Sequence, residues 1–163
     1  MVDLYRFLAD NHIAYERYDH PAVFTVEDVK LLVPPLPAAK TKNLFLRDHK
    51  GMRHFLVVVP ADKRVAIKAL HEVIGSSRLS FASAKRLKKY LGVDPGAVTL
   101  LGLVNDPGHE VELIIDASLW KQEAFQFHPL VNTSTLVVSR KNVKRFLEIT
   151  GHAAKMLDVP EQK

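Results

Sequence analysis

The clearest alternation of apolar and polar residues lies over residues 41–47, and it predicts a β-strand in which Leu44 and Leu46 share one face. Residues 48–51 are of types that favour a tight turn, and the segment 52–59 predicts a returning strand. Because the end of that second strand is apolar at every position, we expect it to be buried on both faces. The two segments therefore predict a central hairpin around which the rest of the chain is organised.

Apolar residues recur at helical spacing in five other segments, several of them bounded by a capping residue and a glycine. These predicted helices span residues 3–10, 25–33, 62–75, 83–92 and 139–151. Shorter runs predict further strands at residues 13–18, 111–115, 125–129 and 135–138. Because strands and helices interleave irregularly, we predict a single compact α/β domain over residues 1–163, with a mixed β-sheet surrounded by helices. The tail from Pro160 is expected to fray.

Length and composition restrict the class of protein. A chain of 163 residues, 47% hydrophobic and 25% charged, is ordinary for a globular domain, and such a domain can bury roughly 70% of its unfolded surface. It has no cysteine, which excludes disulfides and thiolate chemistry and is typical of a cytoplasmic protein. We see no secretory signal and no apolar run long enough to span a membrane, so no membrane partner is expected. The net charge of +5 favours a polyanionic partner.

Familiar catalytic signatures are missing from the sequence, including the G-x-S-x-G elbow, the phosphate-binding P-loop and the H-E-x-x-H zinc motif. The eight histidines are dispersed and none forms an i,i+4 pair, so we expect no metal and no cofactor. Candidate chemistry must therefore come from lone side chains and from backbone groups.

Lys42 lies at the start of the first hairpin strand, after a proline-rich segment at residues 34–37. One interpretation is a lysine that extends into solvent from a strand end. The other is a cationic anchor for a phosphate or a terminal ribose, because a pocket can open at the end of a central strand.

Two further segments are candidates for the wall of such a pocket. The segment 96–102 begins and ends with glycine, and such a loop can present consecutive N–H groups to an oxyanion, although an ordinary surface turn has the same composition. In the segment 127–135, His128 precedes a proline and is held extended. His128 and Asn132 are candidates to contact a polar substrate; alternatively, the histidine is simply hydrogen-bonded within a sheet.

Basic residues cluster on two of the predicted helices. The default interpretation is a solvated surface, and the alternative is a track for a phosphate backbone. The cluster contains Lys85, Arg86, Lys88, Lys89, Lys141, Lys144 and Arg145.

Five segments occur in an order and at a spacing that resemble a known family. They are residues 41–46, 79–83, 91–99, 102–106 and 127–133. Together they resemble the YbaK/prolyl-tRNA synthetase editing-domain family, and in particular its branch of free-standing alanyl-tRNA(Pro) deacylases (ProXp-ala, also called PrdX). The resemblance runs from about the first helix to the last.

The resemblance implies a compact α/β fold and hydrolysis of the ester that joins a wrong amino acid to the 3′ adenosine of proline tRNA, with alanyl-tRNA(Pro) as the expected substrate. It implies that Lys42 contacts the terminal nucleotide, and that a loop presents backbone amides to the ester carbonyl. That loop comprises Gly96, Ala97, Val98, Thr99 and Leu100. A terminal ribose hydroxyl of the tRNA would help to position the attacking water.

The same resemblance places His128 at the amino-acid pocket, and we expect Asn132, Gly102 and Asn43 to contact the substrate as well. The expected partners are the acceptor end of tRNA(Pro) and, as a further candidate, prolyl-tRNA synthetase. The protein is expected to act as a monomer in the cytoplasm.

The chain departs from the family pattern at Leu100, where the family usually has proline. Leucine keeps a backbone N–H but lacks the fixed φ of proline. The sequence therefore does not determine the shape of the loop or which amino acid the enzyme removes from the tRNA. Phe24, Val26 and Leu100 are candidate walls of the amino-acid pocket. Excluding proline while admitting alanine is a steric task, in which one methylene is worth ~1–3 kcal/mol.

Two other hypotheses remain open at this point. The chain could be a tRNA- or nucleotide-binding module of the same fold that has lost catalysis. In that case Leu100, in place of the family proline, would be the sign of the loss. It could also be a regulatory protein that uses the fold to bind a free amino acid.

Overall fold

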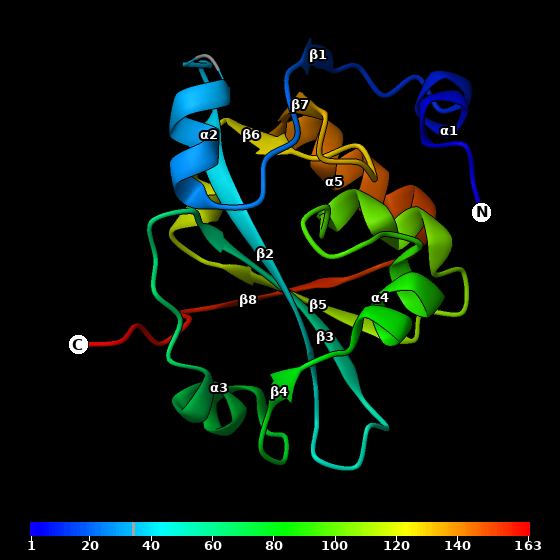
Figure 1. The fold of residues 1–163 in the computed structure, drawn as a ribbon. Helices are drawn as coiled ribbons and strands as arrows, with labels where there is room; N and C mark the ends of the chain where they lie inside the picture. The colour runs from blue at the N-terminus through cyan, green and yellow to red at the C-terminus, as the bar shows by residue number, and fades with distance from the viewer. Residues whose placement is uncertain (34) are drawn as a thin grey trace.

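The computed structural model describes residues 1–33 and 35–163, with the side chain of Val26 outside the description. Within these residues one mixed sheet of eight strands runs through the molecule (Figure 1). Seven strands lie in the order β1 (Glu16–Asp19), β7 (Ser134–Ser139), β6 (Ala124–Phe127), β2 (Ala39–Arg47), β3 (His54–Pro60), β5 (Val111–Asp116) and β8 (Ala154–Leu157), and β4 (Ser80–Phe81) pairs separately with β2. The predicted α/β class, a mixed sheet surrounded by helices, is confirmed.

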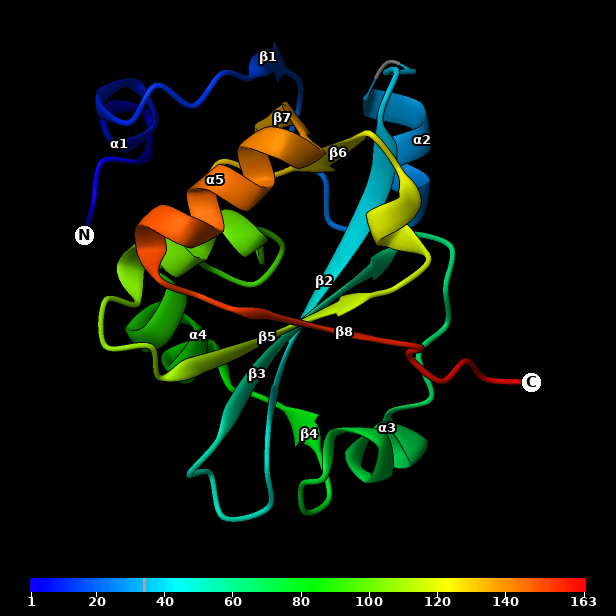
Figure 2. The same cartoon turned by 180° about the vertical axis from the view of Figure 1, so that it is seen from behind.

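Helices cover both faces of this sheet because each presents an apolar stripe to it. The helices α1 (Leu4–Asp10), α4 (Ala84–Leu91) and α5 (Arg140–Thr150) share one core with the sheet, and Figure 2 shows α5 lying over that face. On the other face, α3 (Ile67–Ile74) packs its Leu70 and Ile74 against β3. The remaining helical elements are α2 (Val26–Leu32) and the 3₁₀ turns η1 (Leu100–Asn105) and η2 (Leu119–Lys121).

The predicted central hairpin is confirmed. Residues Thr41–Arg47 of β2 pair antiparallel with His54–Pro60 of β3, and β3 is buried at every position except Pro60. Four of the five expected helix caps also form; the exception is Asp62, because α3 begins later and has no side-chain cap. The side chains of Asp3, Thr25, Ser83 and Ser139 each accept a hydrogen bond from the backbone N–H three residues later.

The second edge of β2 is the feature that positions the site. At its start, Ala39 and Lys40 pair with β6, and at its end Leu46 and Arg47 pair with β4. Among the described residues no strand pairs with the middle of this edge, residues 41–45. The sheet therefore opens locally, and a loop rather than a strand must satisfy the exposed groups there.

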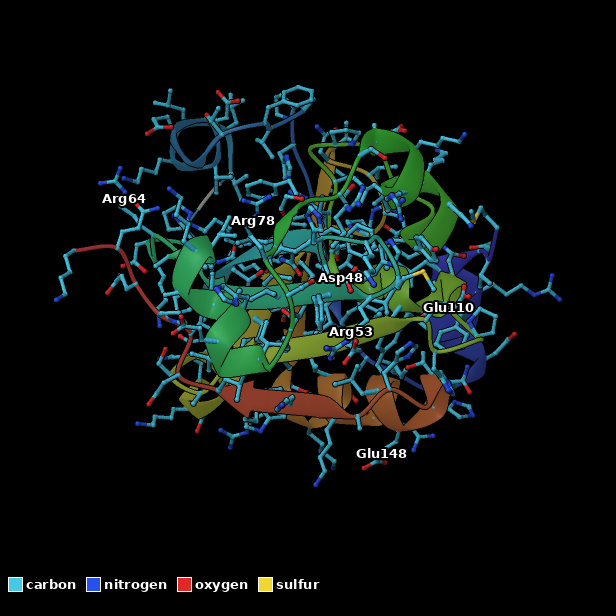
Figure 3. All side chains as sticks on the ribbon, turned by 90° about the horizontal axis from the view of Figure 1, so that it is seen from below. Asp48, Arg53, Arg64, Arg78, Glu110 and Glu148 are labelled. Carbon is cyan, nitrogen blue, oxygen red and sulfur yellow. The ribbon has the colours of Figure 1, made fainter. Side chains whose placement is uncertain are left out.

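The C-terminal tail corrects two expectations. The segment is not frayed: the N–H of Ala66 donates to Pro160 O and that of Gln162 to Arg64 O, both at 2.8 Å. Figure 3 shows Arg64 on the same side of the molecule as this terminal segment. Because the tail pairs with residues 64–66, α3 starts at Ile67 rather than at Asp62.

Three smaller points complete the fold. The sequence did not predict β8, an edge strand of four residues that are all at least partly exposed and so lack a clear apolar pattern. The prolines at residues 34–37 were expected to follow the end of a helix. That helix, α2, ends at Leu32, and Pro34 lies outside the described residues. None of the helices described here has the length and apolar character that crossing a bilayer requires.

Candidate active site

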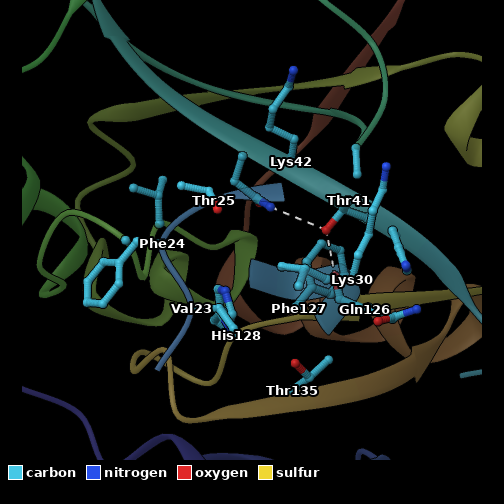
Figure 4. Close-up of a pocket in the computed structure, with 16 residues that line it drawn as sticks. Val23, Phe24, Thr25, Lys30, Thr41, Lys42, Gln126, Phe127, His128 and Thr135 are labelled. Atoms are coloured by element: carbon cyan, nitrogen blue, oxygen red, sulfur yellow. Dashed lines mark hydrogen bonds between the residues drawn. The ribbon is translucent and has the colours of Figure 1, made fainter. Parts of the chain in front are cut away.

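A cavity of about 280 Å³ opens beside the unpaired middle of β2. Its walls come from six separate stretches of the chain, and Figure 4 shows many of the lining residues gathered below and beside the strand. The lining residues are Val23, Phe24, Thr25, Val29, Lys30, Lys40, Thr41, Lys42, Asn43, Ala61, Gly96, Val98, Gln126, Phe127, His128 and Thr135. The cavity thus brings together the β2 start, the 96–98 loop and the 126–128 segment that the sequence singled out.

The loop before η1 is held by its own hydrogen bonds. The N–H of Ala97 donates to Asp94 O at 3.1 Å, and those of Leu101 and Gly102 donate to the Thr99 side chain and carbonyl. Within the described part of the chain, the N–H groups of Gly96 and Val98 have no hydrogen-bond partner, and both residues line the cavity. The loop therefore offers two free amide donors at the cavity wall.

Gly96 is required by its backbone and by its neighbour. Its φ of +95° lies in the region that side chains rarely adopt, and a Cβ there would approach Phe24 Cδ1 to 2.9 Å. The ring of Phe24 thus covers the loop at Gly96, and it remains 69% exposed at the cavity mouth. Phe24 therefore lines the cavity, and its role as a wall of the amino-acid pocket stays a prediction.

Asn43 fastens the loop to β2. Its Oδ1 accepts the N–H of Leu100 at 2.8 Å, while its Nδ2 donates to Thr41 Oγ1 at 3.3 Å. Thr41 in turn donates to the carbonyl of Gln126 at 2.6 Å (Figure 4). Side chains from alternate positions of β2 therefore replace the missing strand pairing. The amide of Leu100, which we expected to face substrate, is engaged in this anchor.

Lys42 lies on the opposite face of β2 from Asn43, because consecutive residues of a strand alternate. Its ammonium group donates to the backbone carbonyl of Lys63, and Figure 4 shows it on the far side of the strand from His128 and Thr135. Burial lowers the pKa of Lys42, and the neighbouring Asp62 carboxylate opposes that shift. Lys42 lines the cavity rim, but its charge does not point at the 96–102 loop.

The Lys63 carbonyl, which accepts the hydrogen bond from Lys42, lies in a turn that an ion pair stabilises. Lys63 Nζ lies 3.1 Å from both carboxylate oxygens of Asp116, which is fully buried. Asp116 also accepts the N–H of Val159 and the hydroxyl of Ser118. Burial raises the pKa of Asp116, but the hydrogen bonds from Ser118, Val159 and Lys63 outweigh burial and lower it overall.

His128 lines the cavity on the side opposite to Lys42. Its Nδ1 lies 3.1 Å from the carbonyl of Ser134. Burial lowers the pKa of this imidazole, and the contact with Ser134 only partly offsets that effect. His128 is therefore held as a neutral ring at the cavity, as a substrate contact would require.

Five predicted site residues do not line the cavity, namely Ala97, Thr99, Leu100, Gly102 and Asn132. Asn132 donates to Val23 O at 2.9 Å and so holds the segment that carries Phe24. Gly102 lies in η1, where a Cβ would come within 3.1 Å of Leu91 Cβ, so the residue permits close packing on α4. Thr99 and Leu100 are fully buried, and Leu100 is therefore not a wall of the pocket. The side chain of Val26, the third candidate wall, lies outside the described residues.

The sequence missed several lining residues because their elements meet only in the folded chain. Val29 and Lys30 lie on α2, and Gln126 and Thr135 lie on neighbouring strands. Lys40 alone carried a usable signal, because it lies two residues before Lys42 on the same strand face.

The basic residues of α4 are less free than the sequence indicated. Arg86 donates to Gly51 O and contacts His54 Nε2 at 2.8 Å, and Lys88 lies 3.5 Å from Asp94. The α4 cluster does not line the cavity. The lysines at the cavity itself are Lys30, Lys40 and Lys42.

Free backbone amides and basic side chains at one cavity suit an enzyme that hydrolyses an ester carried by a nucleic acid. Residues 20–146 match the aminoacyl-tRNA editing domain family, and the chain belongs to that family. It is 37% identical over 147 residues to the prolyl-tRNA editing protein ProX of Acetoanaerobium sticklandii, covering 90% of each chain. It is 33% identical over 144 residues to the mouse (Mus musculus) prolyl-tRNA synthetase associated domain-containing protein 1, covering 86% of this chain and 85% of that one.

Solved structures agree with this fold. A crystal structure described as a proposed trans-editing enzyme for prolyl tRNA synthetase superposes with a TM-score of 0.69 over 99% of each chain, at 16% identity. At that identity the likeness establishes the fold and nothing finer.

Proposed function

We propose that this protein is a trans-editing hydrolase that deacylates mischarged proline tRNA, with alanyl-tRNA(Pro) as its substrate. The observation that carries the proposal is the pair of unengaged N–H groups of Gly96 and Val98 at the wall of the cavity. Membership of the editing-domain family and the names of the relatives, a prolyl-tRNA editing protein among them, support it.

The reaction needs little from side chains because an aminoacyl ester is already activated. A water oxygen forms a bond to the ester carbonyl carbon, and the negative charge that develops on the carbonyl oxygen is stabilised by the Gly96 and Val98 amides. The bond to the ribose oxygen then breaks, and that oxygen takes up a proton. One donor of this kind is typically worth about 10²–10³ in rate. This role is narrower than the sequence implied, since the Ala97 and Leu100 amides are engaged elsewhere.

Lys42 holds the nucleic acid rather than the ester in this proposal. Its ammonium group lies on the outer face of β2, where a phosphate of the terminal nucleotides would replace the Lys63 carbonyl as its partner. Lys30 and Lys40 also line the cavity and form no salt bridge with any described residue. Three cations at one rim favour a polyanionic substrate.

Selection of alanine over proline follows from cavity walls that are apolar and close. Val23 is 2% exposed and is held by Asn132, and Phe24 covers the loop. A proline ring adds two methylene groups to the alanine skeleton, and each such group is worth ~1–3 kcal/mol in an apolar pocket. We also propose tRNA(Pro) as the partner, with prolyl-tRNA synthetase as a second candidate and the monomer as the active form.

A deacylation assay tests the proposal. Proline tRNA charged with alanine, serine, cysteine or proline is incubated with wild-type protein, with Lys42→Ala, and with Lys50→Ala, an exposed lysine of the β2–β3 turn that serves as the control. We expect fast release of alanine by wild type and by Lys50→Ala, strong loss in Lys42→Ala, and retention of proline. Binding of the tRNA without faster release would favour the non-catalytic module instead. A melting shift with free amino acid alone would favour the regulatory hypothesis.

A further inference from the structure

One histidine that lines the cavity, His128, and a second one behind Thr135, His20, have tautomers that can be assigned from their neighbours. His128 Nδ1 lies 3.1 Å from Ser134 O, and His20 Nδ1 lies 2.8 Å from Pro21 O. A carbonyl oxygen can only accept a hydrogen bond, so each Nδ1 carries the hydrogen. In the neutral ring the other nitrogen, Nε2, is then an acceptor.

The hydroxyl of Thr135 is oriented by one of these rings. Thr135 Oγ1 lies 2.8 Å from His20 Nε2, so the hydroxyl donates its hydrogen to that nitrogen. The remaining lone pairs of Oγ1 are left for another donor, and Thr135 lines the cavity although it is only 5% exposed. The His20 ring lies 6.4 Å from the His128 ring, centroid to centroid, so the three groups form one cluster.

This cluster is composed of acceptors. Within the described residues, His128 Nε2 has no hydrogen-bond partner, and none of the residues that line the cavity is a carboxylate. The loop that lines the same cavity supplies donors, the amides of Gly96 and Val98. A ligand that satisfies both sets of groups has a carbonyl oxygen at one end and an N–H group nearby, which is the arrangement in an α-amino ester.

We propose that Thr135 Oγ1 and His128 Nε2 form the subsite for the α-amino group of the aminoacyl ester. The assignment rests on the proposed function and deepens it, because it states which part of the substrate the enzyme must recognise besides the ester. The amine and the ammonium form both carry hydrogens that these acceptors can receive. Lys30, Lys40 and Lys42, which also line the cavity, favour the uncharged amine. His20 behind Thr135 accepts the hydroxyl hydrogen and so leaves the lone pairs of Oγ1 for the substrate amine.

The test changes the substrate first, so that it does not depend on a variant that folds. Short RNA hairpins with the acceptor stem of proline tRNA are esterified with alanine or with propionate, which is alanine without its amino group. Because the two esters differ in spontaneous hydrolysis, the measured quantity is the acceleration by enzyme over buffer. We expect an acceleration for the alanyl ester that exceeds that for the propionyl ester by about tenfold or more, as loss of hydrogen bonds to the amino group implies.

A matched pair of variants assigns the effect to Thr135. Thr135→Val keeps the shape of a β-branched side chain in β7 and removes the acceptor, while Thr135→Ser retains it. We expect Thr135→Val to slow the alanyl ester severalfold and leave the propionyl ester unchanged, and Thr135→Ser to restore the alanyl rate; melting curves confirm folding.

Equal acceleration of the two esters by wild type, or equal loss on both esters in Thr135→Val, would overturn the subsite. Hydrolysis of neither ester by wild type would overturn the proposed function itself, and the subsite with it.

Discussion

Two adjacent residues of β2 show how differently the two faces of one strand are used. On the inner face, Asn43 accepts the N–H of Leu100 at 2.8 Å and fixes the loop that carries the free amides. On the outer face, the Lys42 ammonium donates to the Lys63 carbonyl, next to the buried Asp116. Alternation along the strand thus separates the side chain that fixes the loop from the Lys42 charge, which we propose to face the nucleic acid.

The comparison shows that the two faces are stabilised by different kinds of interaction. The inner face relies on hydrogen bonds between neutral groups, each with a modest net contribution of about 1 kcal/mol. The outer face depends on an ion pair whose side chains are 17% and 1% exposed, for Lys63 and Asp116 respectively. Breaking the Lys63–Asp116 pair should therefore cost more stability than removing a single hydrogen bond on the inner face.

The largest effect is expected for Asp116→Ala. The substitution leaves Lys63 without its partner and removes the acceptor for Val159 and Ser118, and breaking a buried pair in this way costs about 3–5 kcal/mol. Urea denaturation of the variant and wild type measures the difference. An unchanged free energy of unfolding would show that the pair does not brace the turn.

The same carboxylate gives a prediction for pH. Because the pKa of Asp116 is lower in the folded protein than in the unfolded chain, its contribution is present above the unfolded value near 4 and is lost as pH falls through the folded value. Asp116→Asn cannot titrate, so the difference in stability between wild type and this variant should shrink as the pH falls below about 4. A difference that stays constant as the pH falls would contradict the assignment.

The next effect is expected for Lys42→Ala on catalysis. If Lys42 binds a phosphate of the terminal nucleotides, its loss should lower kcat/KM for alanyl-tRNA(Pro) by about 10²-fold, which corresponds to about 2.7 kcal/mol. The melting temperature should change little, because the single hydrogen bond to the Lys63 carbonyl contributes only about 1 kcal/mol. Lys40→Ala, on the same face two residues earlier, should lose less. An equal loss of kcat/KM in both variants would mean that the positive charge of this strand face matters, and not a specific contact of Lys42.

Whether a feature of this site can be predicted from the sequence depends on how far apart in the chain the interacting residues lie. The hairpin, four of the helix caps and the left-handed glycines Gly75, Gly92 and Gly151 follow from local sequence, and the structure has them where the pattern predicted. The alternation over residues 41–47 also correctly separated the two faces of β2. These features involve residues that lie close together in the chain or along one strand.

The wrong expectations concern contacts between distant segments. Pairing of the tail with residues 64–66, and the use of Asn132 to hold Val23, depend on where separate elements meet, which no local pattern encodes. The free amides are a similar case. The glycine-bounded loop indicated candidate donors, but only the hydrogen bonds from Ala97 and Leu100 decide which amides remain available.

A smaller effect is expected at the inner face, where a double-mutant cycle isolates one hydrogen bond. Asn43→Ala should cost about 1–3 kcal/mol, because it leaves the N–H of the fully buried Leu100 without an acceptor. In a Leu100→Pro background that N–H is absent, so the same substitution should cost about 1 kcal/mol less. Urea denaturation of the four proteins gives the coupling energy. A coupling energy of zero would mean that the Asn43 side chain does not anchor the loop.

The smallest effect is expected at the end of the chain, on the outer face. Deleting Gln162 and Lys163 removes the hydrogen bonds from Gln162 to the carbonyls of Arg64 and Val65, which together should contribute about 1 kcal/mol. For a domain of this size the melting temperature should fall by about 2–4 °C. Deletion of Lys163 alone removes neither bond and is the control. If both deletions leave the melting temperature unchanged, the tail is attached through Val159 and Pro160 alone, and the outer face owes its stability to Asp116 rather than to the end of the chain.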